Sequence, residues 1–350
     1  MKSKKEKILS MDKFIHQALY DKKFGYYMKK NPFGQNGDYI TSPNISVLFS
    51  EMISIWIILF WENLKCPKRI NLIELGSGNG EMIKQIIKTF EKFPIFKKCC
   101  KINILEKSPY LKKIQKKKLK NNKIKWLKNL SSISNHPSIF IANEFFDAMP
   151  IKQFFKKKNK WFERYVKIKN LKQPTFLDVP VDIKKVEKKV GFKISFDQKF
   201  IEFSPLTFQY LKNISKKIQK NNGGLLIIDY GYWEQEMKNT LQSIYKHKFN
   251  NILNNLGKAD ITYNINFALM EKILKNLNLK INGKVYQKDF LKNLGILKRA
   301  EIISKNLSFS KKADIYYRVK RLIDENQMGV LFKVILATNK KINFNKGFAS

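Results

Sequence analysis

Cysteine and histidine are scarce in this chain of 350 residues, which contains three of each. Cys66, Cys99 and Cys100 are too few to build a disulfide framework, and the scattered histidines show no zinc-ligand spacing. The sequence therefore favours a reducing compartment and predicts chemistry without a bound metal.

Long apolar runs are also missing. The most apolar stretch covers residues 53–61, well short of the roughly 20 residues that a transmembrane helix needs. The basic first residues are not followed by an uninterrupted apolar stretch, so no signal peptide is expected. Apolar residues recur at helical spacing over 45–64, with Ser50 and Glu51 on the opposite side, which predicts a buried amphipathic helix. We expect no stable membrane insertion.

Acidic residues are few: there are 28, against 69 lysines and arginines, which gives a net charge of +41. A basic surface attracts phosphate backbones and anionic lipids, so nucleic acid is the first partner to consider. The lysines are spread along the whole chain, however, together with asparagine, isoleucine and phenylalanine. All four have A/T-rich codons, so a biased genome would produce the same composition without any such partner. The 27 phenylalanines and 14 tyrosines exclude a disordered chain.

Apolar strands alternate with helices from residue 70 onward. The expected strands cover residues 70–75, 101–105, 123–127, 138–142, 225–228 and 330–337. This alternation predicts a parallel sheet covered by helices on both faces. Short strands separated by turns over 151–203 predict an antiparallel insertion, and residues 263–325 are expected to be helical.

A glycine loop lies between the first of these strands and the helix that follows it. Gly76, Gly78 and Gly80 allow a tight turn and a close approach to a ligand, while the helix N-terminus offers unpaired N–H groups. The spacing is not the G-x-G-x-x-G of dinucleotide binders, and the lysine of a P-loop is absent. Glu74 directly precedes the loop and would repel a pyrophosphate. It suits a ligand that carries an amine or a sulfonium cation.

A second acid, Glu106, ends the next expected strand, where it is placed to accept hydrogen bonds from ribose hydroxyls. The glycine loop, Glu74 and Glu106 together describe a pocket for S-adenosylmethionine. The alternative is a helix-capping glycine turn that binds nothing, with Glu106 as a surface acid. Trp126, at the end of a short strand, is expected near the adenine.

Eight stretches distributed over the whole chain carry the pattern of a known family. They are YDKKFGYY (20–27), FGQNGDYITSPNIS (33–46), IELGSGNG (73–80), ANEFFDAMPIKQF (142–154), LIIDYG (226–231), GKADIT (257–262), QKDFLKNLG (287–295) and MGVLFKV (328–334). Together they resemble the MidA-like family of S-adenosylmethionine-dependent methyltransferases, known in mitochondria as a complex I assembly factor.

The resemblance implies a fold and a cofactor site. The fold is an α/β class I methyltransferase fold, Rossmann-like, with a seven-stranded, mostly parallel sheet. Residues 1–64 would form an N-terminal helical cap with a cofactor-covering loop, 65–150 and 204–350 the core with helical additions, and 151–203 the inserted β-rich subdomain. Segment 37–41 would belong to a lid; the alternative is a plain turn. The expected cofactor-binding residues are Asp38, Glu74, Gly76, Ser77, Gly78, Gly80, Glu106 and Asn143.

The same resemblance implies an activity, a partner and a location. The family transfers methyl to a protein arginine, and its mitochondrial member acts on the 49 kDa-type subunit of complex I. We therefore expect a bacterial cytoplasmic protein that supports complex I assembly through this subunit, or a mitochondrial matrix protein if the source is eukaryotic. The oligomeric state is left open, with a homodimer among the states considered.

An arginine acceptor requires carboxylates, because its guanidinium stays protonated and is a poor nucleophile. Glu144 is the first candidate for clamping the guanidinium and Asp147 the second, with Phe145 or Phe146 as a wall. In the alternative reading Asp147 is an N-cap and the phenylalanines belong to the core. Asp229, at the end of a later strand, is a further candidate catalytic acid; its alternative is a turn-stabilising role.

Two other functions are considered. A nucleic-acid methyltransferase would fit the net charge, but such enzymes commonly carry Asn/Asp-Pro-Pro-Tyr/Phe where this chain has Asn143, Glu144, Phe145 and Phe146. The missing prolines and the added acid make nucleic acid an unfavoured partner. The second is a non-catalytic assembly factor that binds S-adenosylmethionine only for stability.

Overall fold

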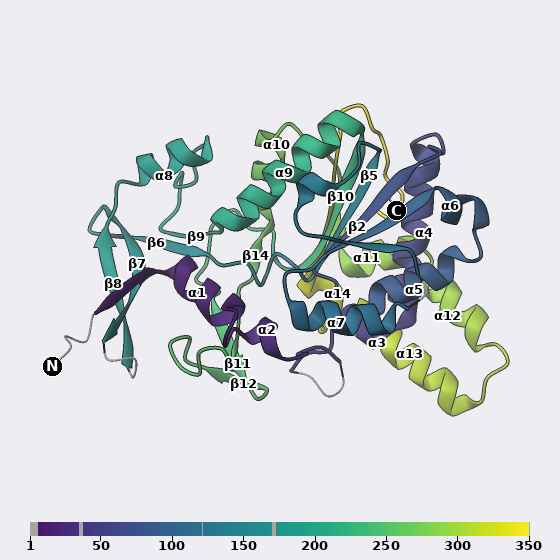
Figure 1. The fold of residues 1–350 in the computed structure, drawn as a ribbon, viewed down its shortest axis with the longest axis horizontal. Helices are drawn as coiled ribbons and strands as arrows, with labels where there is room; N and C mark the ends of the chain where they lie inside the picture. The colour runs from purple at the N-terminus through teal and green to yellow at the C-terminus, as the bar shows by residue number, and fades with distance from the viewer. Residues whose placement is uncertain (1–5, 35–37, 121, 170–172, 350) are drawn as a thin grey trace. The chain divides into compact units, whose positions relative to one another are not determined.

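The computed structural model describes residues 6–34, 38–120, 122–169 and 173–349 (Figure 1). The chain divides into two compact units. The core unit comprises Asn31–Phe145, Asn213–Gly231 and Leu277–Ser350, and the accessory unit comprises Met1–Lys30, Phe146–Lys212 and Tyr232–Asn276. The chain therefore crosses between the two units five times, and residues 1–30 group with 146–212 rather than with 31–64.

The core unit contains the strand–helix alternation that the sequence predicts. Its elements are α3 (Ser42–Ile45), α4 (Val47–Asn63), β2 (Ile70–Leu75), α5 (Glu81–Phe90), α6 (Pro94–Cys99), β3 (Cys100–Leu105), α7 (Pro109–Lys118), β4 (Ile124–Leu127), a 3₁₀ turn (Leu130–Ser132), β5 (Ser138–Asn143), the second part of α9 (Pro205–Asn221), β10 (Gly223–Tyr232), β15 (Lys280–Tyr286), α11 (Gln287–Asn293), α12 (Ile296–Ser304), α13 (Phe309–Ile323), α14 (Met328–Leu331) and β16 (Phe332–Thr338).

Among the described residues of the core unit, seven strands pair side by side in one sheet, in the order β15-β16-β10-β5-β2-β3-β4. The pairs β10–β5, β5–β2, β2–β3 and β3–β4 are parallel, whereas β16 is antiparallel to both of its neighbours. The prediction of an α/β fold with a mostly parallel sheet is confirmed. Strand β15 corrects the expectation that 263–325 is helical throughout: its sequence, KINGKVY, is too polar to be recognised as a strand.

Both faces of the sheet are buried, as parallel sheets require. Helices α4, α5, α11, α12 and α13 pack with alternate strand residues into one apolar core. Its strand members include Ile70, Leu72, Ile139, Ile141, Leu226, Ile228, Val334 and Leu336. All six residues of β2 and of β5 are buried, which holds the ends of these strands in place for the glycine loop and for Asn143.

Helix α4 differs from the predicted amphipathic helix. Ser50 was expected on its polar side but is completely buried, as is Ser54, whose hydroxyl donates to the Ser50 carbonyl at 2.6 Å. Glu51 is only half-buried, and Arg299 of α12 donates to it at 2.8 Å. Helix α12 and its neighbours pack against the side of α4 that carries Ser50 and Glu51, which the sequence pattern predicted to face solvent.

The accessory unit is built mainly from antiparallel strands. Its elements are β1 (Lys7–Ser10), α1 (Met11–Tyr20), α2 (Tyr26–Lys29), β6 (Lys152–Lys157), β7 (Lys160–Lys169), β8 (Gln173–Pro180), α8 (Ile183–Val190), β9 (Phe200–Phe203), the first part of α9, β11 (Gln242–Tyr245), β12 (Lys248–Asn250), β13 (Asp260–Thr262), β14 (Ile265–Asn266) and α10 (Phe267–Asn276).

The pairing in this unit is antiparallel in both of its sheets. One sheet has the order β1-β7-β6-β9, with β8 also paired to β7, and the other has the order β12-β11-β13. Residues 1–64, which were expected to form a helical cap with a loop, also include strand β1; four residues are too few to show a strand period. None of the helices in the described part of the chain combines the length and the apolar character that a membrane span requires.

Candidate active site

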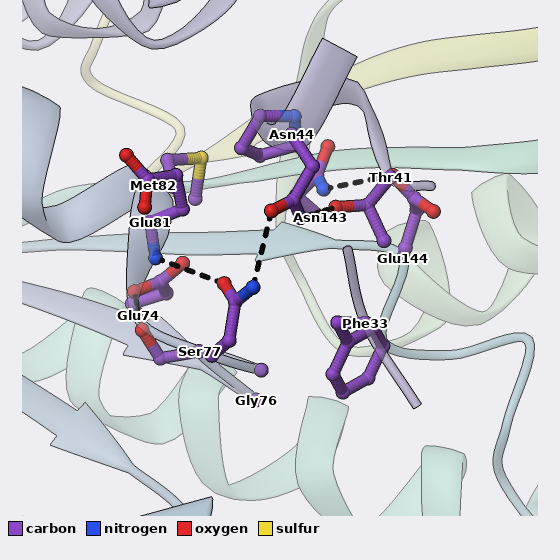
Figure 2. Close-up of a pocket in the computed structure, with 13 residues that line it drawn as sticks. Phe33, Thr41, Asn44, Glu74, Gly76, Ser77, Glu81, Met82, Asn143 and Glu144 are labelled. Carbon is purple, nitrogen blue, oxygen red and sulfur yellow. Dashed lines mark hydrogen bonds between the residues drawn. The ribbon is translucent and has the colours of Figure 1, made fainter. Parts of the chain in front are cut away.

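A pocket lies at the carboxyl ends of β2 and β5, the edge where α/β sheets bind ligands. Figure 2 shows its lining. The lining residues are Phe33, Thr41, Pro43, Asn44, Glu74, Gly76, Ser77, Gly78, Asn79, Glu81, Met82, Asn143 and Glu144. Six of the residues that the sequence singled out are thus brought together: Glu74, Gly76, Ser77, Gly78, Asn143 and Glu144.

The glycine loop needs its glycines at two positions in particular. Gly76 has φ +67°, and a Cβ atom there would lie 2.6 Å from the ring of Phe145. Gly78 has φ +51°, and a Cβ atom would lie 3.3 Å from the ring of Phe33. A side chain at either position would be strained and would crowd a phenylalanine ring. The bare glycine loop lines the pocket and is called the glycine cradle below.

Glu74 is a buried acid, with 4% of its surface exposed. Burial raises the pKa of its carboxyl group from about 4.5 to about 8, although a hydrogen bond from the Ser77 hydroxyl to Glu74 Oε2 acts in the opposite direction. At neutral pH most molecules therefore hold a proton on Glu74. A cation in the pocket would favour the ionised form and so would be attracted to this position.

Glu106 directly follows β3 and is fixed through both carboxylate oxygens. The backbone N–H of Ser108 donates to Oε1 at 2.8 Å, and Gln115 Nε2 donates to Oε2 at 2.9 Å. Burial raises the pKa of Glu106, against the lowering effect of these hydrogen bonds. The described lining of the pocket does not include Glu106, Gly80, Asp38 or Asp229.

These residues fit S-adenosylmethionine. The glycine cradle accepts a close ligand, Glu74 suits an amine or sulfonium, and Glu106 keeps lone pairs that ribose hydroxyls can use. Among the residues that the structure describes, no group of three or more metal-ligating side chains is positioned to hold a metal ion.

Glu144 is held in an unusual backbone conformation, with φ +49°. Its N–H donates to the Ile228 carbonyl at 2.9 Å, and its Oε1 accepts from the Ser42 N–H at 3.0 Å. The same Oε1 accepts from Asn143 Nδ2 at 3.2 Å (Figure 2). Non-glycine residues in this region are uncommon and concentrate at functional sites. The strained turn directs the carboxylate into the pocket.

Asp229 is completely buried, and its carboxylate holds the turn at Glu144 and Phe145 through a backbone hydrogen bond. Its Oδ2 accepts from the Phe145 N–H at 3.2 Å, and its Oδ1 accepts from the Tyr230 N–H at 3.0 Å. Both contacts are to backbone N–H groups, and the catalytic role expected for Asp229 stays a prediction. Phe146 is completely buried, whereas Phe145 is half-buried.

Asp147 and Asp38 are not among the described lining residues of this pocket. Asp147 belongs to the accessory unit, where it is 7% exposed and its carbonyl accepts from the Tyr263 N–H at 3.2 Å. Asp38 is half-buried in the core unit. Gly37, which belongs to the expected lid segment, lies outside the described residues.

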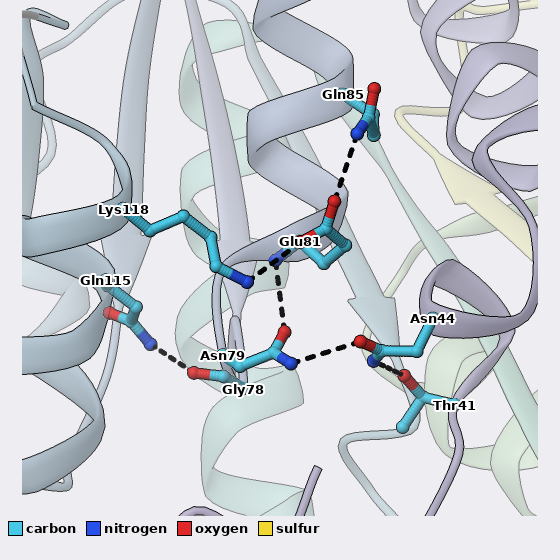
Figure 3. Close-up of polar contacts among 8 residues, drawn as sticks. All are labelled: Thr41, Asn44, Gly78, Asn79, Glu81, Gln85, Gln115 and Lys118. Atoms are coloured by element: carbon cyan, nitrogen blue, oxygen red, sulfur yellow. Dashed lines mark hydrogen bonds and ion pairs between the residues drawn. The ribbon is translucent and has the colours of Figure 1, made fainter. Parts of the chain in front are cut away.

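Sequence reasoning missed a series of side-chain hydrogen bonds that joins the 41–44 segment to the glycine loop (Figure 3). Asn79 Nδ2 donates to Asn44 Oδ1 at 3.1 Å, and Asn44 Nδ2 donates to Thr41 Oγ1 at 2.6 Å. Asn79 Oδ1 accepts from the Glu81 N–H at 3.2 Å. The asparagine within Gly-Asn-Gly, two residues before a helix, was the available signal, since asparagine readily caps helices.

Glu81 opens helix α5 and stays ionised. Burial acts to raise its pKa, but hydrogen bonds from Lys118, at 2.8 Å, and Gln85, at 3.0 Å, outweigh it, so the pKa is lowered overall (Figure 3). The pocket therefore has a charged acid at the helix N-terminus and a largely protonated one, Glu74, at the strand end.

A family model matches residues 52–285, about two thirds of the chain, and is described as "Putative S-adenosyl-L-methionine-dependent methyltransferase". Among curated proteins, the chain is 27% identical to "Protein arginine methyltransferase NDUFAF7, mitochondrial" of Xenopus tropicalis, over 93% of this chain and 81% of that protein. The human protein of the same name is 25% identical over 93% of this chain and 78% of its own length.

A crystal structure shares the fold of the whole chain. It is that of a Burkholderia thailandensis protein bound to S-adenosyl-homocysteine, which aligns with a TM-score of 0.82 over 97% of this chain and 90% of that chain. The sequence identity is 21%, so this similarity supports the fold alone.

Proposed function

Because the chain belongs to the family of S-adenosyl-L-methionine-dependent methyltransferases, as its resemblance to the MidA-like family predicted, we propose that it methylates an arginine of a protein substrate. S-adenosylmethionine is its cofactor. The bound cofactor supplies a methyl group activated by the neighbouring sulfonium. The chain itself has to orient the acceptor and take up a proton.

The observation that carries this proposal is the position of Glu144, whose carboxylate lines the same pocket as Glu74 and the glycine loop. A guanidinium next to a methyl donor needs a carboxylate within reach, and Glu144 meets that need. The names of the relatives point in the same direction.

In this proposal Glu144 accepts hydrogen bonds from the guanidinium fork, keeps positive charge away from the attacking nitrogen and receives its proton. The N–H of Ser42 and the amide of Asn143 hold the carboxylate in place. Asp229 holds the turn that presents it. Asp147, three residues later in the sequence, is the second candidate for contacting the acceptor.

The proposed substrate is the 49 kDa-type subunit of complex I, in support of complex I assembly. It rests on the family resemblance and on the mitochondrial relatives. The proposed location is the bacterial cytoplasm, or the mitochondrial matrix if the source is eukaryotic, and a homodimer is the oligomer to look for.

The test is to incubate the purified protein with methyl-labelled S-adenosylmethionine and that subunit, and to locate the label by mass spectrometry. Label on one arginine supports the proposal. Glu144→Gln should lower turnover by about a hundredfold or more while cofactor binding persists. Glu51→Gln, which alters a half-buried glutamate paired with Arg299, is the control and should keep full turnover.

Two further measurements, complex I assembly in cells and the labelling assay with added nucleic acid, examine the alternative functions. A Glu144→Gln protein that loses methylation but still supports complex I assembly in cells would favour the non-catalytic assembly factor. Label in added RNA or DNA instead of protein would contradict the proposal. Full turnover by Glu144→Gln would remove Glu144 from the mechanism.

A further inference from the structure

Gln115, on α7, is a completely buried glutamine whose side chain touches both parts of the cofactor site. Its Nε2 donates to the Gly78 carbonyl at 2.9 Å and to Glu106 Oε2 at 2.9 Å. Its Oε1 accepts from Trp126 Nε1 at 3.0 Å. Figure 3 shows the bond from Gln115 to Gly78. One amide therefore links the glycine loop, the expected ribose acid and a tryptophan.

The orientation of this amide follows from the chemistry of its neighbours. The indole N–H of Trp126 is only a donor, so the Gln115 atom that faces it has to be the oxygen. A backbone carbonyl is only an acceptor, so the Gln115 amino group has to face the Gly78 carbonyl, and the same amino group reaches Glu106 Oε2. The three hydrogen bonds are mutually consistent, and reversing the amide would break the bonds to Trp126 and Gly78.

We propose that Gln115 is a positioning residue for cofactor binding, which holds Glu106 at a fixed place relative to the glycine loop so that the carboxylate can receive the ribose hydroxyls. The inference rests on the proposed placement of S-adenosylmethionine in this pocket. It adds a residue that does not itself have to touch the ligand.

The remaining contacts show why a glutamine is suited to this position. Glu106 Oε1 is already held by the Ser108 N–H, so the Gln115 bond fixes the second oxygen and thus the plane of the carboxylate. A Cβ atom added to Gly80 would lie 3.4 Å from Gln115 Cγ, so the glutamine stem also packs against the end of the loop. Glutamate at 115 would place a second acid against Glu106, and methionine would fill the space without donating.

The experiment compares two ligands by calorimetry: S-adenosyl-homocysteine and its analogue lacking both ribose hydroxyls. Gln115→Met should weaken binding of S-adenosyl-homocysteine by about tenfold or more, because Glu106 loses the hydrogen bond that fixes its second oxygen. The affinity for the analogue should fall much less, since the analogue has no ribose hydroxyls that could donate to Glu106. The hydroxyls should therefore contribute less affinity in the variant than in the native protein.

Gln287→Met is the matched control. Gln287 is also completely buried, and its Nε2 donates to the Leu322 carbonyl at 2.9 Å. This variant should lose stability and leave the affinities for both ligands unchanged. Equal weakening of both ligands by Gln115→Met would overturn the inference and leave Gln115 as a packing residue.

Two further outcomes distinguish a failure of the ribose role of Glu106 from a failure of the variant to fold. If the native protein binds S-adenosyl-homocysteine but does not favour it over the analogue, the ribose role of Glu106 fails, and the inference with it. If Gln115→Met does not fold, Trp126→Phe removes the N–H that orients the amide. Trp126→Phe should also reduce the difference in affinity between S-adenosyl-homocysteine and the analogue. An unchanged affinity difference in that variant would refute the inference.

Discussion

Replacing Glu74 with glutamine tests how the pocket recognises a cation. The carboxyl group is 4% exposed, and burial raises its pKa from about 4.5 to about 8. The native fold therefore holds a proton on Glu74 at pH values where the unfolded chain has lost it. A difference of that size corresponds to about 5 kcal/mol between the ionised and neutral forms.

The sign of the stability effect follows from proton counting. Between pH 4.5 and 8 the native state binds more protons than the unfolded state, so the free energy of unfolding falls as the pH rises. The contribution is complete below pH 4.5, is lost progressively up to about pH 8 and is constant above it. Glu74→Gln cannot titrate, so its stability relative to the native protein should rise by about 1.4 kcal/mol per pH unit across this range.

Cofactor binding should show the opposite dependence. S-adenosylmethionine is cationic at its sulfonium and amine, so it should bind best when Glu74 is ionised. The affinity of the native protein should therefore increase about tenfold per pH unit toward pH 7 and flatten near pH 8, where Glu74 becomes ionised and the ligand α-amine, with a pKa of about 7.7–8.0, begins to lose its proton. Glu74→Gln should bind more weakly and without this slope.

The assays are urea unfolding and calorimetry at pH 6, 7, 8 and 9 for both proteins, with the stability of Gln287→Met as a control for an unrelated buried substitution. A stability difference between native and Glu74→Gln protein that does not change with pH would refute the raised pKa. An affinity slope that persists in Glu74→Gln would assign the titration to another group.

Three more substitutions test other parts of the site and core. Gly78→Val should abolish cofactor binding, because φ is +51° and a Cβ atom would lie 3.3 Å from Phe33; unchanged calorimetric affinity would contradict the loop's role. Asp229→Asn should lose one of two backbone hydrogen bonds and cost about 1–3 kcal/mol of stability, with a larger fall in kcat than in cofactor affinity. Gly223→Ala should prevent stable folding, measured by circular dichroism, because its Cβ atom would lie 1.9 Å from the Ser138 carbonyl oxygen.

The sequence predicted the part of the site that is continuous along the chain. A strand, a glycine loop and a helix follow one another within residues 70–90, so Glu74 and Gly78 could be placed from local pattern alone. Glu144 could be placed for the same reason, because it directly follows a strongly apolar strand.

The sequence could not predict pairs that depend on tertiary contact. Asn44 and Asn79 meet although 35 positions separate them, and nothing local signals that partnership. Strand β15 was missed because its neighbour β16, which is wholly buried, stabilises a polar sequence that has no strand signal of its own. Ser50 was placed on the wrong side because the helices that cover α4 are distant in sequence.

The antiparallel strand β16 has a consequence for synthesis on the ribosome. It lies between β10 and β15, yet at residues 332–338 it leaves the ribosome after both of them. Until then β10, whose Leu225–Ile228 segment is completely buried in the finished sheet, has an open backbone edge. Open apolar edges pair readily with other chains. Messages that stop before residue 332 should therefore yield aggregating products, and chaperones that bind nascent chains should hold this protein until β16 is made.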